Sequence, residues 1–305
     1  MKYLQYPLIA LFILAINSIA SAQNNEDARA LVKEGVKLND EKKYAEAIDK
    51  YSQALKIDTG NLYADYQMAY ALFLSDKGTE GIPYLQKVVK ADTKLNAAAY
   101  DLLGLICFKS KQYAEAEKYA IEAIKLDPKH ASSQRMYALV SFHQNKRAQA
   151  LLGFCSFILL EPNTARSAEA FGNIQHILQG GALKPEPGEM IPHAIEANAN
   201  ALNQAITQAV AETGKRKYAT AGDLLTAQLK AIFTAIGRAA ENQTGNDFFR
   251  KYMAAYFYQL AQSSNTPAFA RLVSLSTPES AKWAKDNAQQ MTDLDSWIKE
   301  TVRVF

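Results

Sequence analysis

A repeat of about 34 residues is the feature that most constrains how this 305-residue chain can fold. Four sequence columns recur at intervals of 34, 35 and 34 residues, and one inserted residue near Leu95 or Asn96 accounts for the longer interval. The columns are Gly35, Ala69, Gly104 and Ala138; Ala47, Gly81, Ala116 and Ala150; Ala54, Val88, Ala123 and Phe157; and Thr59, Thr93, Pro128 and Pro162. Four columns that shift together indicate a structural repeat.

Residues 97–130 show most clearly what one repeat folds into. Small residues at facing positions let two antiparallel helices approach closely. Apolar residues recur at helical spacing in both halves, with Leu102, Leu103 and Ile106 in the first and Tyr119, Ile121, Ala123 and Ile124 in the second. Pro128 ends the second helix, because proline lacks an amide donor and disfavours a helical residue before it. One such hairpin cannot bury its apolar surface alone, so we expect hairpins to stack.

These residues resemble the tetratricopeptide repeat, a family of 34-residue helix-turn-helix units. The matching residues are Tyr100, Leu103, Gly104, Tyr113, Ala116, Ala123 and Pro128 in one repeat and Leu31, Gly35, Tyr44, Ala47, Tyr51 and Ala54 in another. The resemblance covers about residues 28–179, as repeats 28–61, 62–96, 97–130 and 131–164 followed by a capping helix. It implies an all-α fold, a solenoid of helical hairpins. In the degenerate second repeat we expect Pro83 in the first turn of its second helix, where proline is tolerated.

The 34-residue pattern ends in the second half of the chain, but helical periodicity continues. Glycines and prolines between Gly180 and Gly188 predict that residues 165–188 form the capping helix and a linker. We interpret residues 189–305 as a bundle of five or six helices that resembles no family we can name. An aromatic stripe from Phe248 to Leu260 is expected to be its core. Further helices are predicted to start at Thr266-Pro267, at Thr277-Pro278 and near Thr292 or Asp293.

The first 22 residues have the pattern of a secretory signal peptide. Lys2 is followed by an apolar run from about Leu8 to Ile19 and by small residues at the end. The run is shorter than the roughly 20 residues that span a bilayer. We therefore predict cleavage after Ala22, a mature array over 23–164, and an exported protein, periplasmic or secreted, with no membrane span in its mature chain.

The sequence carries no recognisable catalytic or cofactor motif. A net charge of +3 gives no global attraction to nucleic acid. Cys107 and Cys155 are too few for a disulfide framework, and whether they are bonded stays open. HExxH, CxxC, Gly-x-Ser-x-Gly and a phosphate loop are absent from the sequence. We predict no catalytic residue, no cofactor and no metal; the weaker alternative is a metal site at His143 and His176 with Glu169.

The resemblance also assigns a concave surface to the first helices of the repeats, where family members bind extended peptides or partner helices. The residues that it places there, as a partner-binding groove, are Tyr63, Tyr66, Tyr70, Phe73, Asp101, Leu105, Phe108, Arg135, Leu139 and Phe142. The first repeat adds Arg29, Val32, Val36 and Asn39. Members that clamp a terminal carboxylate carry lysine and asparagine at the places of Val32 and Val36, so we expect another mode here. Arg135 is a candidate anchor for an acidic group.

Three functional hypotheses follow. The first is an exported, non-catalytic scaffold that binds another protein in the groove with roughly micromolar affinity. The second makes the C-terminal bundle an enzyme or small-ligand domain to which the repeats present substrate. The third is a rigid structural subunit of a cell-envelope complex. The aromatic side chains of the predicted groove could also be covered by the C-terminal bundle or by a second copy of the chain.

Overall fold

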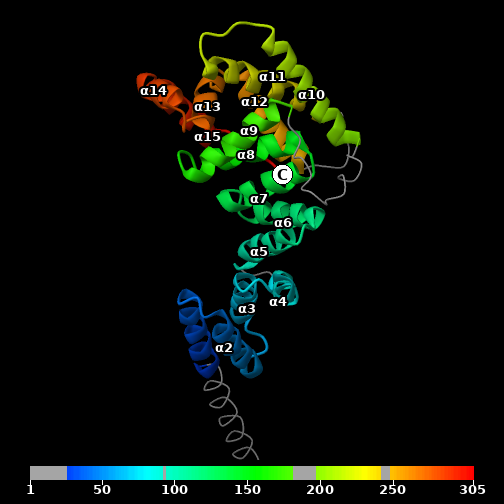
Figure 1. The fold of residues 1–305 in the computed structure, drawn as a ribbon, viewed down its shortest axis with the longest axis vertical. Coiled ribbons are helices and arrows are strands. Elements are labelled where there is room, and N and C mark those ends of the chain that lie inside the picture. The colour runs from blue at the N-terminus through cyan, green and yellow to red at the C-terminus, as the bar shows by residue number, and fades with distance from the viewer. Residues whose placement is uncertain (1–25, 92–93, 181–196, 242–247) are drawn as a thin grey trace, which may run out of the picture. The chain divides into compact units, whose positions relative to one another are not determined.

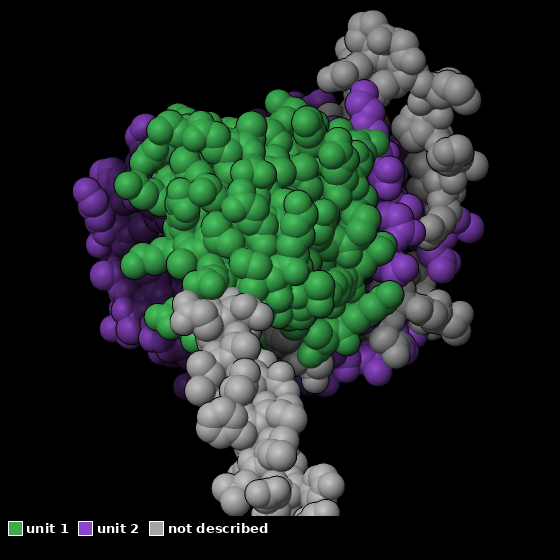
Figure 2. Space-filling view, turned by 90° about the horizontal axis from the view of Figure 1, so that it is seen from below, with its two compact units in different colours: residues 1–110 green, residues 111–305 purple. Residues whose placement is uncertain are grey.

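The computed structural model describes residues 26–91, 94–180, 197–241 and 248–305; the regular structure in these residues is helical, with no strand among them. By packing, the chain divides into two compact units, residues 1–110 and residues 111–305 (Figure 2). Within the described residues, no helix has the length and apolar character needed to cross a membrane. The predicted all-α fold class is confirmed. The predicted signal peptide lies outside the described residues.

The first unit consists of paired helices (Figure 1). A helix over residues 26–40 is followed by α2 (Tyr44–Ile57), α3 (Leu62–Leu74), α4 (Gly78–Lys90) and α5 (Asn96–Lys109). Tyr51 lies at the centre of the core and receives a hydrogen bond of 3.1 Å at its hydroxyl from the Asn39 amide. Pro83 is the sixth residue of α4, so the expectation that it lies in the first turn is wrong. The helix tolerates it because Thr79, whose carbonyl loses its amide donor, is exposed to water.

The turns between paired helices preserve the repeat register in the backbone. Lys42, Asp76, Lys111 and Asn145 all have φ between 56° and 61°, at the same spacings of 34, 35 and 34 residues as the sequence columns. The amide after this residue donates to a carbonyl five residues earlier, as from Lys43 to Leu38 over 2.8 Å. These bonds form the Schellman motif that ends many helices. None of the four is glycine, so in each turn a residue with a side chain adopts the left-handed backbone conformation, which costs free energy.

Small residues bring the helices of a pair into close contact. A Cβ added to Gly81 on α4 would lie 3.1 Å from Cα of Ala69 on α3. One added to Gly35 would lie 2.5 Å from the Tyr51 ring. All members of the first three sequence columns are buried. The columns therefore mark the seam between helices, as the repeat pattern predicts.

The second unit combines helices of the array with the C-terminal helices. It contains α6 (Tyr113–Leu126), α7 (Ala131–His143), α8 (Arg147–Leu160), α9 (Ala165–Leu178), α10 (Ala197–Gly214), α11 (Ala221–Glu241), a π-helix η1 (Phe248–Ala254), α12 (Ala255–Gln262), α13 (Thr266–Val273), α14 (Pro278–Asp286) and α15 (Ala288–Glu300). Helix α8 packs against α7 and α9 and also against α10, η1 and α13. Asn203 of α10 accepts from the Arg147 amide over 2.9 Å and so caps α8. The predicted fourth repeat and the C-terminal region thus share one core.

The C-terminal predictions agree in part with this unit. The stripe from Phe248 to Leu260 is buried as expected, although its first half is a π-helix. Thr277 caps α14 as predicted, whereas α13 has Asn265 before it and Thr266 already inside the helix. The last helix begins at Ala288, earlier than predicted, because the chain between α14 and α15 is a single turn residue. The boundaries at 164 and 188 stay predictions; the linker over 181–188 lies outside the described residues.

Candidate partner-binding surfaces

In the first unit, the predicted groove residues of α3 form an aromatic face. Tyr63 and Tyr70 are 46% and 38% exposed, and Tyr66 between them is half-buried. Their spacing of three and four residues puts the rings on one side of the helix. Gln67 donates a hydrogen bond of 2.9 Å to the Tyr63 hydroxyl and fixes the position of that ring. We call these three tyrosines, together with the neighbouring row on α5, the tyrosine face.

Helix α5 contributes a second row beside these tyrosines. Asp101, Leu105 and Phe108 are half-buried on α5, which packs against α3. Burial, followed by the nearby Asp101 carboxylate, raises the pKa of Tyr66. The tyrosine face therefore has one carboxylate next to it, a combination suited to a partner that presents a cationic or hydrogen-bond-donating side chain.

The far end of the same row forms a small hollow. Phe73 lies beneath the Lys109 ammonium, which is 5.1 Å from the ring centroid and 2.8 Å from Oδ1 of Asp76. The hollow has a volume of about 200 Å³ and is also lined by Gly78, Thr79, Ile106 and Ser110. Small-molecule sites have volumes of about 300–1,000 Å³, so this space fits one side chain of a partner.

The first repeat does not extend this face. Val32 is buried in the core of the first unit with Tyr51, and Val36 packs against that core. Asn39 is buried through its bond to Tyr51. The side chains that the resemblance placed on the concave surface here are instead used within the fold. Arg29 is exposed.

In the second unit, the predicted groove residues are partly used by the chain itself. Arg135 forms an ion pair of 2.8 Å with Glu169 on α9, so the acidic group that it anchors is internal. Phe142 is only 4% exposed, contrary to the expectation of a groove residue. Its ring packs against Phe154 at 6.1 Å and against His176 at 5.9 Å. Leu139 is half-buried. Neighbouring helices α8 and α9 have covered this part of the face.

His143 and His176 are engaged by aromatic rings. His143 stacks on Tyr113 at 5.0 Å, while His176 contacts the edge of Phe142. Among the residues that the structure describes, no group of three His, Cys, Asp or Glu side chains could hold a metal ion. Both cysteines are buried thiols, and burial raises the pKa of Cys155.

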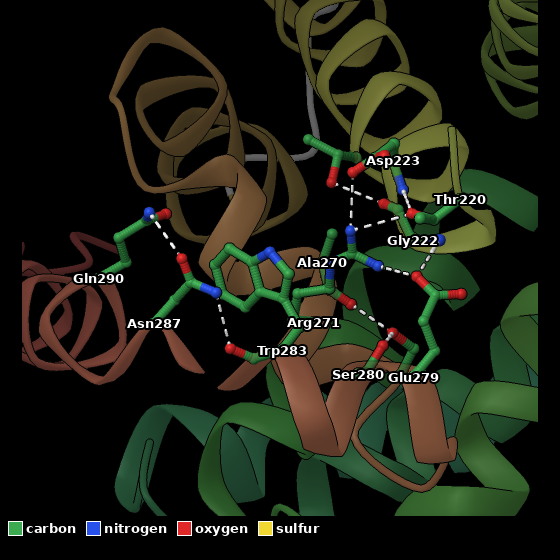
Figure 3. Close-up of polar contacts among 12 residues, drawn as sticks. Thr220, Gly222, Asp223, Ala270, Arg271, Glu279, Ser280, Trp283, Asn287 and Gln290 are labelled. Atoms are coloured by element: carbon green, nitrogen blue, oxygen red, sulfur yellow. Dashed lines mark hydrogen bonds and ion pairs between the residues drawn. The ribbon is translucent and has the colours of Figure 1, made fainter. Parts of the chain in front are cut away.

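A polar cluster in the second unit joins three helices around a buried arginine (Figure 3). The Arg271 guanidinium on α13 binds Glu279 of α14, and its Nη2 lies 2.7 Å from Oδ1 of Asp223 on α11. Trp283 covers the guanidinium carbon at 5.4 Å from its ring centroid. Burial raises the pKa of Glu279, but hydrogen bonds from Thr220, Gly222 and Arg271 outweigh it, and the pKa is lowered. The Glu279 carboxylate is therefore held as an anion, and the ion pairs of both carboxylates with Arg271 join the three helices.

An aromatic niche on the second unit was not predicted from the sequence. Residues 301–305 leave α15 in a non-helical conformation and place Arg303 and Phe305 against η1 and α12. The sequence offered no signal for this contact, because its partners lie far away in the chain and η1 does not follow the α-helical period. We call this surface, formed by Ser156, Phe248, Tyr252, Met253, Tyr256 and Phe257, the aromatic niche.

Paired antiparallel helices with a recurring left-handed turn define a helical-repeat protein. Residues 97–130 match the family model of the tetratricopeptide repeat. Residues 97–130 are thus identified as a tetratricopeptide repeat, as the sequence pattern predicted. No curated protein matches the chain by sequence.

Several solved structures are similar to parts of the chain. The first tetratricopeptide repeat domain of Spaghetti (RPAP3), bound to the HSP90 peptide SRMEEVD, is 24% identical with a TM-score of 0.37 and covers 38% of this chain and 92% of its own. YrrB, described as a protein with an unusual peptide-binding site, is 19% identical with a TM-score of 0.45, covering 54% and 84%. Pseudomonas aeruginosa pilF is 18% identical with a TM-score of 0.45, covering 79% and 98%.

Proposed function

We propose that this chain is a non-catalytic protein-interaction scaffold that binds an extended peptide or a helix of a partner on the tyrosine face of α3 and α5. The observation that supports it is the exposure of Tyr63 and Tyr70 on one side of α3, beside half-buried Tyr66. Tyrosines present large, rigid rings with a polar tip, which makes them common anchors at interfaces.

The carboxylate of Asp101 gives the face its polarity. Asp101 is half-buried on α5 beside α3, and after burial its charge is the next cause of the raised pKa of Tyr66. A partner with a lysine or arginine flanked by apolar residues would place its cation there and its apolar groups over the rings. Burying two rings contributes roughly 1.5–3 kcal/mol each before association costs, so we expect a weak, transient complex.

The test replaces Tyr63 and Tyr70 with alanine in the full chain, since their exposure makes loss of folding a minor effect. A matched control is Leu126→Ala, which removes an apolar side chain 52% exposed on α6 of the other unit. Proteins captured from a native envelope extract are quantified by mass spectrometry against the wild-type chain. We expect at least about a tenfold loss of specific capture with the double variant and no loss with the control. Equal capture by both would show that this face is not the binding site.

We further propose that the chain is exported after cleavage behind Ala22. The support is the charged start, the short apolar run and the small residues of the first 22 positions. The intact mass of the chain purified from its native cell should correspond to a start at Gln23. A mass that includes the first 22 residues would contradict export by this signal.

The polar cluster around Arg271 does not favour the enzyme hypothesis. Its carboxylates, Asp223 and Glu279, are both bound by the guanidinium, and the pKa of Glu279 is lowered. A general acid or base needs a pKa near the working pH, and binding to a guanidinium moves a carboxylate away from that range.

A further inference from the structure

The aromatic niche holds Arg303 by contacts of the kind that peptide-binding sites use. The guanidinium carbon lies 4.0 Å from the Tyr256 ring centroid, 5.1 Å from that of Tyr252 and 5.3 Å from that of Phe257. Nη1 donates a hydrogen bond of 2.8 Å to Oγ of Ser156 on α8. Three ring faces and one oxygen acceptor therefore surround a single cation, which is the arrangement of an aromatic cage.

Phe305 occupies a second subsite beside this cage. Its ring stacks on Tyr252 with centroids 4.5 Å apart and an interplanar angle of 5°. The Phe248 ring lies 6.4 Å from it and is nearly parallel. Phe248 and Tyr252 both belong to the π-helix η1, whose wider turn differs from the flanking α-helices. Such π-helical turns are rare and are often found at functional sites.

The two valines that flank Arg303 make little use of the niche. Val302 and Val304 are 77% and 64% exposed, so side chains alternate between the niche and solvent as in an extended strand. The amide of Thr301 still bonds to the Trp297 carbonyl over 2.9 Å and closes α15. Beyond that bond the segment is attached mainly through Arg303 and Phe305.

We propose that the aromatic niche is a peptide-binding site for extended segments that carry arginine and, two residues later, an aromatic residue. Residues 301–305 of this chain are its resident occupant, and a partner peptide of the same chemistry replaces them. The specificity follows from the contacts, because the cage selects a planar cation and the ring stack selects an aromatic side chain. The position between them is exposed and accepts any residue. This site does not depend on the tyrosine face of the first unit.

The test uses the full chain with Arg303→Ala and Phe305→Ala, which removes both anchors of the resident segment and leaves the niche residues intact. The probe is a fluorescent peptide, TVRVF, blocked at both ends and titrated by fluorescence anisotropy. We expect it to bind the double variant at least about tenfold more tightly than the wild-type chain, in which the resident segment competes. Peptides TVAVF and TVRVA should bind at least about tenfold more weakly.

The matched control peptide is TARAF, which changes only the two exposed positions and should bind within about threefold of TVRVF. Absence of TVRVF binding to a double variant whose helical circular dichroism equals that of the wild type would overturn the proposal. Equal binding of TVRVF and TVAVA would also overturn the proposal, because TVAVA lacks both anchor side chains and its binding would show that the site does not recognise them.

A second measurement does not require the double variant to fold. A peptide with a photoreactive benzophenone in place of phenylalanine is irradiated with the wild-type chain, and labelled residues are mapped by mass spectrometry. We expect labelling within η1 that excess TARAF suppresses and excess TVAVF does not. Labelling spread over the surface would overturn the proposal. So would a wild-type dimer that dissociates on adding TVRVF, since the occupant would then be the same segment of a second copy.

Discussion

The close approach of α7 and α8 can be tested with two glycines of the second unit whose surroundings are opposite. Gly153 lies in the middle of α8, and an added Cβ would be 2.9 Å from Cβ and 3.0 Å from Cα of Ala138 on α7. Gly172 lies in the middle of α9, is exposed, and an added Cβ would meet no atom within 4 Å. Both helices have 14 residues and belong to the second unit.

The expected magnitudes follow from two opposing effects. Replacing glycine by alanine inside a helix stabilises by roughly 0.5–1 kcal/mol because the unfolded chain loses freedom. At Gly153 the new methyl group meets backbone, so α7 and α8 have to separate, and overpacking of this kind costs about 1–3 kcal/mol. We therefore expect Gly153→Ala to destabilise by about 1–2 kcal/mol and Gly172→Ala to stabilise by about 0.5–1 kcal/mol.

Urea unfolding followed by circular dichroism at 222 nm measures both free energies on the same scale. The Gly153 variant should have a lower midpoint with an unchanged slope, because the surface exposed on unfolding is the same. Its melting temperature should fall by about 5 °C for a unit of this size. If both alanine variants were equally stabilising, helix propensity alone would govern these positions. The close contact with Ala138 would then not limit the size of the residue at position 153.

The remaining predictions concern backbone, charge and thiol. Lys42→Gly should stabilise by about 0.5–1 kcal/mol in urea unfolding, because the left-handed strain that glycine removes from the folded state is larger than the conformational free energy that it adds to the unfolded chain. Asn145→Gly should stabilise less, since asparagine tolerates the left-handed conformation. Arg271→Met should lower stability by about 1–3 kcal/mol at pH 7, below the cost of a fully buried pair because its carboxylate partners are partly exposed. The lowered pKa of Glu279 contributes stability that is present above its unfolded value of 4.5 and lost as the pH falls, so melting temperatures between pH 6 and 3 should drop less in this variant than in the wild type. Cys155 is buried with a raised pKa, so alkylation followed by mass spectrometry should proceed only as fast as the second unit opens.

The repeat register could be predicted from sequence because it depends on local spacing. The same intervals that align Gly35, Ala69, Gly104 and Ala138 reappear in the left-handed turn residues, which no sequence column had indicated. Lysine and aspartate at those turns lack the usual glycine signal. The helix ends therefore follow from the pairing of the helices, and the pairing follows from the small residues.

The exposure of the groove residues could not be predicted in the same way. Asn39, Phe73, Phe108 and Phe142 occupy equivalent positions, at intervals of 34, 35 and 34 residues. Phe108 is half-buried and Phe73 lies under Lys109, while Asn39 bonds to Tyr51 and Phe142 is enclosed by Phe154 and His176. The repeat period determines which way a side chain points. Whether that side chain is exposed or covered depends on neighbouring residues, which need not follow the repeat.

The aromatic niche shows a stronger limit of local patterns. Residues 302–305 alternate, and an alternating segment normally buries its apolar residues and exposes its polar ones. Here the two valines face solvent while Arg303 is enclosed by rings and bonds to Ser156, 147 positions away. The reversal has a physical reason, because the niche offers aromatic faces and an oxygen acceptor, which attract a guanidinium more than a valine methyl. A site of this kind is defined by what the distant helices present, so it becomes visible only when they are assembled.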